Sequence, residues 1–166
     1  MKTAARQKGF TLIELLVVIG ILAILFSIVL IAINPAKQFG QANDTKRRSD
    51  TLQILNTIHQ YVAEHSGNLP TGLGDGKTVV PTAYIGNGTG QIDLCALLTP
   101  TYISALPVDP AQVAKAGKPA GEALTNTECA ASGSYNTGYE VAVDANGRVT
   151  VSAPGAVGTT PISITR

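Results

Sequence analysis

The sequence contains little charge, little histidine and little cysteine. Of its 166 residues only 14% are charged, and the formal net charge is +1. This composition lacks the basic surface typical of nucleic-acid-binding proteins, so we predict no direct nucleic-acid site. The two histidines, His59 and His65, are six positions apart and do not share a helix face as an i, i+4 metal pair does. The two cysteines have no histidines clustered with them, which argues against a zinc site.

Motifs for catalysis are also missing. The sequence has no Walker-type loop and no Ser/His/Asp set within a supporting motif, and its glycine clusters at 72–76 and 86–90 are spaced as loops. The segment 144–147 (Asp-Ala-Asn-Gly) resembles part of a calcium loop, but it lacks the further ligands and the closing Glu. The sequence therefore predicts no enzyme activity, no cofactor and no metal site.

A long apolar run near the N-terminus is the most prominent feature that is present. From Leu15 to Ile33 the sequence has no charged residue, and a helix of this length spans roughly 28 Å, close to the hydrocarbon core of a bilayer. The run is too long for an ordinary secretory signal, and no small-residue cleavage site follows it. Basic residues flank it on both sides, at positions 2, 6 and 8 and again at 37 and 46–48, so charge alone does not decide its orientation.

The residues at the start of this run carry a recognisable motif. The segment 8–16 (Lys-Gly-Phe-Thr-Leu-Ile-Glu-Leu-Leu) resembles the class III signal of type IV pilins and pseudopilins. The resemblance implies that a prepilin peptidase cuts between Gly9 and Phe10 at the cytoplasmic face, and that the new Phe10 amine is methylated. Residues 1–9 would be the cleaved leader, residues 10–33 the transmembrane and filament-core helix, and the remainder would lie outside the inner membrane.

Glu14 is the charged residue at the edge of the apolar segment. A carboxylate at this position is costly in a membrane and usually indicates a function or a partner. The pilin resemblance implies that Glu14 pairs with the N-terminal amine of a neighbouring subunit when the helices pack together outside the bilayer. The alternative is a carboxylate that merely reaches the membrane surface. Because of the surrounding motif, we favour a role in assembly.

A break in the helix is expected directly after the apolar run. Pro35 lacks a backbone donor and biases Asn34 away from helical geometry, and Gly40 follows five residues later. We predict a kinked, continuing helix with Pro35 and Gly40 as its kink residues, the alternative being a plain linker. Helical spacing resumes near Asp44, with apolar positions on one face, and Gly67 stops the helix. Residues 34–66 are thus assigned to the kink and an amphipathic helix.

Residues 67–166 are predicted to form a globular head. Tyr139–Val143 and Arg148–Ser152 alternate apolar and polar residues around an Asn-Gly turn, which predicts a β-hairpin. Ile162–Thr165 is a candidate edge strand, residues 67–90 read as a long loop, and residues 105–110 (Ala-Leu-Pro-Val-Asp-Pro) as a rigid connector. The overall prediction is an α+β, pilin-like fold, with a long N-terminal helix whose amphipathic half packs on a small antiparallel sheet.

Cys95 and Cys129 both lie far from the apolar run, in the predicted head. A location outside the membrane favours a disulfide between them, and two free thiols are the alternative. The bridge would close a loop of 34 residue steps. By the chain-entropy relation such a loop is worth about 3–4 kcal/mol.

Three functional interpretations follow. The first is a subunit of a type IV pilus, a helical homopolymer built through residues 10–33 and displayed at the cell surface, with adhesion, motility or DNA uptake as roles of the filament. The second is a pseudopilin of a type II secretion system or a minor pilin. The third is a membrane-tethered binding module that never polymerises, for which Glu14 would have no use. The resemblance implies the prepilin peptidase and an inner-membrane assembly platform as partners.

Overall fold

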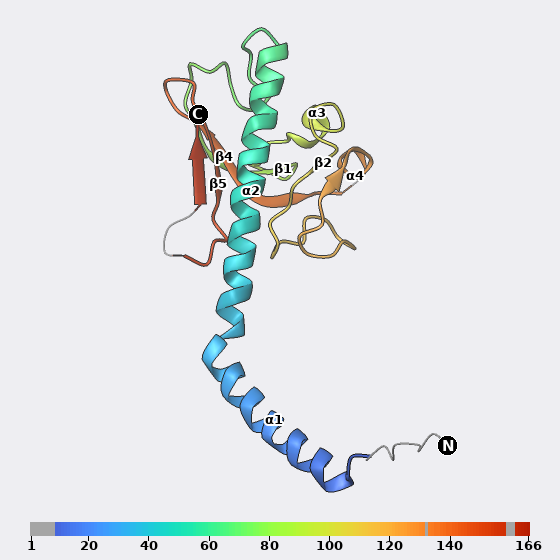
Figure 1. Cartoon of the computed structure of the whole chain (residues 1–166). Helices are drawn as coiled ribbons and strands as arrows, with labels where there is room; N and C mark the ends of the chain where they lie inside the picture. The colour runs from blue at the N-terminus through green and yellow to red at the C-terminus, as the bar shows by residue number, and fades with distance from the viewer. Residues whose placement is uncertain (1–8, 132, 159–161) are drawn as a thin grey trace, which may run out of the picture. The chain divides into compact units, whose positions relative to one another are not determined.

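The computed structural model describes residues 9–131, 133–158 and 162–166 (Figure 1). The chain divides into two compact units, Met1–Phe39 and Gly40–Arg166, which are described separately. The predicted α+β, pilin-like arrangement is confirmed. The helices are α1 (Leu12–Ile33), α2 (Pro35–Glu64), α3 (Cys95–Leu98) and α4 (Asn126–Ala130), and the strands are β1 (Val80–Gly86), β2 (Ala105–Leu106), β3 (Leu124–Thr125), β4 (Asn136–Val143), β5 (Val149–Ala153) and β6 (Ile162–Thr165).

Helix α1 forms most of the first unit. Its 22 residues include no buried residue. Among the described residues it is the one helix that is long and apolar enough to cross a membrane. The hydroxyl of Ser27 donates to the carbonyl of Ala23 at 2.8 Å, so this polar group is satisfied within the helix. Most of the leader, residues 1–8, lies outside the described residues.

The break between α1 and α2 is confined to Asn34. This residue has left-handed backbone geometry, with φ at 46°, and ends α1. Pro35 begins α2, a position where a missing N–H costs nothing, and the Asn34 side chain accepts a hydrogen bond from the N–H of Lys37 at 3.3 Å. Asn34 therefore terminates one helix and caps the next.

Gly40 has a different place from the one we predicted. It lies within α2, which runs without interruption from Pro35 to Glu64, so the helix is not unwound at this residue. A Cβ atom at this position would approach Cγ2 of Val157 to 3.1 Å. Glycine is therefore explained here by close packing against the segment that follows β5, and the interruption of the helix does not extend this far.

The second unit packs α2 against an antiparallel sheet of order β1-β4-β5-β6 (Figure 1). Burial alternates along β4 and β5, as expected for strands with one face on a core. The predicted hairpin is confirmed, with Val143 opposite Val149. The core combines residues of α2 with inward-facing residues of the sheet, including Ile54, Leu55, Ile58, Tyr139, Val141, Val143, Val149 and Val151.

Strand β1 was missed by the sequence analysis, which treated residues 67–90 as a loop. It pairs with β4 with two irregularities in register. The burial of its residues is irregular as well. The strand therefore lacks the regular alternation of apolar and polar residues that predicts a half-buried strand from sequence. Ile162–Thr165 is confirmed as the edge strand β6.

Candidate functional site: the N-terminal segment

The start of α1 is organised by a reciprocal pair of hydrogen bonds between Thr11 and Glu14. The Glu14 carboxylate Oε2 accepts from the Thr11 backbone N–H at 2.8 Å and from its hydroxyl at 2.7 Å. The Glu14 N–H donates to the Thr11 hydroxyl at 3.3 Å. This is a capping box, which satisfies donors that a helix N-terminus otherwise leaves open. The spacing Thr-x-x-Glu at residues 11–14 is the sequence signal of this motif.

The capping box leaves part of the Glu14 carboxylate available. All hydrogen bonds that it accepts within the described residues go to Oε2. A carboxylate has about four acceptor positions. An incoming cation can therefore bind the Oε1 side without displacing Thr11. The geometry allows Glu14 to cap its own helix and to meet a positive group at the same time.

Gly9 and Phe10 precede α1 without regular secondary structure. Phe10 is 88% exposed. A Cβ atom added at Gly9 would meet nothing within 4 Å. The fold of this chain thus gives no reason for a glycine at position 9, whereas access of a peptidase to the backbone would give one.

A second polar cluster joins α2 to the head, and the sequence analysis did not foresee it. The Arg47 guanidinium, only 2% exposed, donates from Nε to Oδ2 of Asp109 at 2.6 Å and from Nη2 to Oδ1 at 2.9 Å. Its Nη1 donates to Asp44 at 2.9 Å. These bonds raise the pKa of Arg47, against the effect of burial. Arg47 therefore stays charged inside the domain.

The cluster continues to Asp50, which lies one helical turn beyond Arg47. Its carboxylate accepts from the Tyr139 hydroxyl at 2.7 Å and from Lys46 Nζ at 2.6 Å. Burial, and next the bond to Asp50, raise the pKa of Tyr139. Lys46 also donates to the carbonyl of Val108 at 3.1 Å. The cluster therefore links α2 to β4 and to the Leu-Pro-Val-Asp-Pro connector, and its role is to hold the head together.

The predicted disulfide is present. Cys95 in α3 and Cys129 in α4 are bonded, with their Cα atoms 5.8 Å apart and 34 positions apart in the chain. Both cysteines are buried. The alternative of two free thiols is therefore wrong, and the bridge joins the two short helices on one side of the head.

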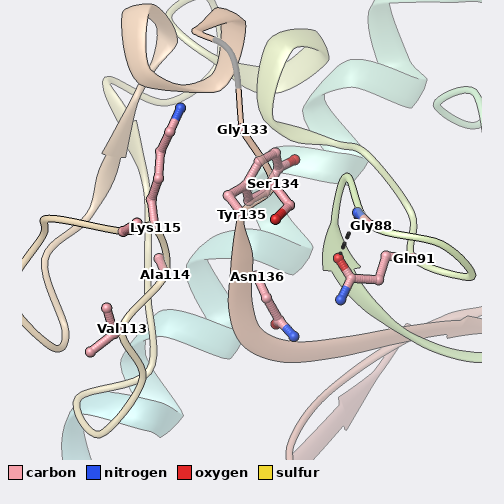
Figure 2. Close-up of a pocket in the computed structure, with 10 residues that line it drawn as sticks. Gly88, Gln91, Val113, Ala114, Lys115, Gly133, Ser134, Tyr135 and Asn136 are labelled. Carbon is pink, nitrogen blue, oxygen red and sulfur yellow. Dashed lines mark hydrogen bonds between the residues drawn. The ribbon is translucent and has the colours of Figure 1, made fainter.

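A hollow of about 590 Å³ lies near these helices, between the loops around residues 88–91, 113–116 and 133–136 (Figure 2). Lys115 is the charged residue in its lining, and its ammonium already donates to the carbonyls of Glu128 and Ala131. Gln91 accepts from the N–H of Gly88 at 2.9 Å. The hollow therefore offers no acid and base side by side, and we assign it no chemistry.

The histidines show no arrangement for metal binding. His65 stacks on Tyr61 with ring centroids 3.8 Å apart, and its Nδ1 lies 2.9 Å from the Tyr61 carbonyl. His59 is half-buried on α2. No group of three or more His, Cys, Asp or Glu side chains suited to a metal ion occurs within residues 9–131, 133–158 and 162–166.

Comparison with known proteins returns one finding. Residues 4–30 match the family described as the prokaryotic N-terminal methylation motif. A search of curated proteins and a search of solved structures each gave no match. The matched residues include Gly9, Phe10 and the Thr11–Glu14 capping box. The chain thus carries, at residues 4–30, the class III signal peptide of type IV pilins and pseudopilins.

Proposed function

We propose that this protein is the structural subunit of a type IV pilus. In this proposal the peptidase cuts between Gly9 and Phe10, the Phe10 amine is methylated, and the processed chain polymerises through residues 10–33. The observation that carries the proposal is the exposure of α1, which has 22 residues and buries none of them. So large an apolar surface requires either lipid or other copies of the same helix around it.

Glu14 supports polymerisation over simple anchoring. A helix that only anchors a domain has no use for a carboxylate near the membrane edge. In the proposed filament the free side of Glu14 meets the Phe10 amine of a neighbouring copy, so each charge is compensated after it leaves the membrane. The inner-membrane assembly platform extracts the subunit, and the filament extends from the cell surface.

A pseudopilin of a type II secretion system is the second candidate. The N-terminal signal is common to pilins and pseudopilins, and stretches similar to the Leu-Pro-Val-Asp-Pro part of the connector at residues 105–110 recur in pseudopilins and related pilin-like proteins. In this chain Asp109 of the connector is the buried partner of Arg47. This pairing gives Asp109 a structural role in the head, which serves a pilus subunit and a pseudopilin equally.

Material sheared from the cell surface separates the two candidates. We would examine it by electron microscopy and measure the intact mass of this protein. We expect thin filaments and a mass that begins at methylated Phe10, with two hydrogens fewer for the Cys95–Cys129 bridge. Processed protein found only in the membrane fraction, with no shed filaments, would overturn the pilus proposal in favour of a pseudopilin or a minor pilin.

A further inference from the structure

Two Asn-Gly pairs occur in the head, at residues 87–88 and 146–147. An asparagine that precedes a glycine is open to deamidation, because the backbone nitrogen of the glycine can attack the side-chain carbonyl carbon of the asparagine. Glycine has no Cβ atom to hinder this approach. The reaction also needs a side-chain amide that can turn toward the next residue, and the fold treats the two amides differently.

The amide of Asn87 is held at both of its ends. Its Oδ1 accepts from the N–H of Tyr135 at 2.7 Å, and its Nδ2 donates to the carbonyl of Gly133 at 3.3 Å. These partners are 48 and 46 positions further along the chain, so the two bonds exist only in the folded head. To meet the nitrogen of Gly88, the side chain of Asn87 has to give up both bonds.

The amide of Asn146 is free in comparison. This residue is exposed in the turn between β4 and β5. Its backbone N–H donates to Oδ1 of Asp144 at 2.8 Å, but within the described residues its side-chain amide makes no hydrogen bond. Its backbone is not in the left-handed region, where asparagine is favoured over other residues. The fold therefore gives the amide of Asn146 no structural role and does not restrain it.

The attacking nitrogen is restrained to a similar degree at both sites. The N–H of Gly147 donates to the carbonyl of Asp144 at 3.0 Å, and the N–H of Gly88 donates to Oε1 of Gln91 at 2.9 Å. Each nitrogen has to give up one hydrogen bond before it can lose its proton. The two sites therefore differ at the amide and not at the nucleophile, which makes Asn87 an internal control for Asn146.

We propose that Asn146 is a site of spontaneous deamidation in the folded protein, and that the fold protects Asn87. The Gly147 nitrogen loses its proton to a base in the solvent and forms a bond to Cγ of Asn146. The side-chain nitrogen takes up a proton and leaves as ammonia, so that a cyclic succinimide results. Water then opens the ring at either carbonyl and leaves aspartate or isoaspartate at position 146. The net reaction consumes one water and releases one ammonia, without oxidation or reduction.

Isoaspartate should disturb the turn more than aspartate does, because the main chain then runs through the former side chain and gains a methylene group. The turn joins Val143 to Val149, which lie opposite each other in the hairpin. It is also closely packed, since a Cβ atom at Gly147 would approach the carbonyl oxygen of Gly76 to 2.6 Å. Because turn length sets the register of a hairpin, we expect isoaspartate to loosen this end of β4 and β5.

Peptide mass spectrometry of the purified full-length protein in detergent tests the proposal. The folded protein is incubated in mildly alkaline buffer, and samples are quenched with acid, reduced and digested with trypsin. The two sites fall on different tryptic peptides, residues 78–115 and 116–148, which the Cys95–Cys129 bridge joins until it is reduced. We expect Asn146 to react at least about tenfold faster than Asn87, since two additional hydrogen bonds must break at Asn87. Equal rates overturn the proposal.

Unfolding provides the matched control. In urea, with the bridge reduced, Asn87 has lost both of its bonds, and the two asparagines should react at similar rates. If Asn87 stays slow in the unfolded chain, the fold is not what protects it, and the proposal is overturned. Asn146→Gln should leave position 146 unmodified in the folded protein, because the longer side chain forms the corresponding ring much less readily.

The products test the mechanism. Opening of a succinimide yields both aspartate and isoaspartate, and an isoaspartyl methyltransferase with a labelled methyl donor detects the second. Aspartate alone would indicate direct hydrolysis and overturn the role of Gly147. Protein that carries isoaspartate should unfold at a lower urea concentration than Asn146→Asp, which has the charge without the added methylene. Equal midpoints would overturn the predicted loosening of the hairpin.

Discussion

Arg47 and Asp109 form a two-bond ion pair inside the head, with Nε–Oδ2 at 2.6 Å and Nη2–Oδ1 at 2.9 Å, although they are 62 positions apart in the chain. Both side chains are almost fully buried. Removing one partner of such a buried ion pair strongly destabilises the folded protein, because the other charge then remains buried without compensation. The pair therefore controls how α2 and the connector at 105–110 are held together.

Arg47→Met should destabilise the head by about 3–5 kcal/mol, since it leaves the Asp109 carboxylate buried and unpaired. The measurement is the free energy of unfolding by urea in detergent, followed by circular dichroism. Replacing both residues, as Arg47→Met with Asp109→Leu, should cost markedly less. A double variant as unstable as the single one would show that the charge is not the cause.

Acid should weaken the head in a defined pH range. Hydrogen bonds from Lys118, and next from Thr125, lower the pKa of Glu128 to about 2. Burial raises the pKa of Asp109, but its bonds to Arg47 and to the N–H of Ala111 outweigh burial and leave it below the ordinary value. A group with a depressed folded-state pKa contributes stability that is complete above its unfolded-state pKa and is lost as the pH falls through the folded-state value.

We therefore expect the free energy of unfolding to be level above about pH 5 and to fall progressively toward pH 2. The measurement is a urea series at constant ionic strength between pH 2 and 6. Glu128→Gln should make the decline less steep. If the free energy of unfolding declines with pH equally steeply in the wild-type protein and in Glu128→Gln, Glu128 does not contribute to the acid sensitivity.

Loss of the disulfide should be costly for so small a head. Cys95→Ser combined with Cys129→Ser opens the 34-residue loop and should reduce stability by about 3–4 kcal/mol. Thermal unfolding of the full chain in detergent, with and without reductant, measures this loss. The reduced wild-type protein should match the double variant, and a difference below about 1 kcal/mol would contradict the loop-closure account.

Glu14→Ala should enter the membrane at wild-type levels and assemble poorly, because the Phe10 amine of the next copy then has no partner. The measurement is the amount of sheared filament relative to the amount of protein in the membrane. Normal filament yield would rule out the pairing.

Thr11→Val provides the control for that variant. It removes the hydroxyl side of the capping box and weakens the start of α1 by about 1 kcal/mol, yet it keeps the Glu14 carboxylate. Filament yield should therefore change much less than in Glu14→Ala. Equal loss in the two variants would show that Glu14 acts as a helix cap and not as an intersubunit partner.

The features that depend on neighbouring residues could be predicted from the sequence. The apolar run, the stop at Asn34-Pro35 and the β4–β5 hairpin are local, because a few adjacent side chains decide the backbone geometry. The N-terminal motif is local too, and the family comparison at residues 4–30 bears it out. Cleavage after Gly9, methylation of Phe10 and the pairing of Glu14 stay predictions.

The features that depend on distant residues required the tertiary structure. In the sequence Arg47 is one of three consecutive basic residues, and only packing against Asp109 distinguishes it from Arg48, which faces outward. A glycine at position 40 predicts a helix break from sequence alone, whereas the fold places Val157 where a Cβ atom of that residue would lie. The sequence by itself determined that this chain has a helix long and apolar enough to cross a membrane and carries a prepilin signal, because both depend on contiguous residues. The apolar spacing of α2 predicts that Leu55 and Ile58 are buried, but the burial of Arg47 and Asp50 beside them was decided only by the fold, because it depends on what the rest of the chain places against the helix.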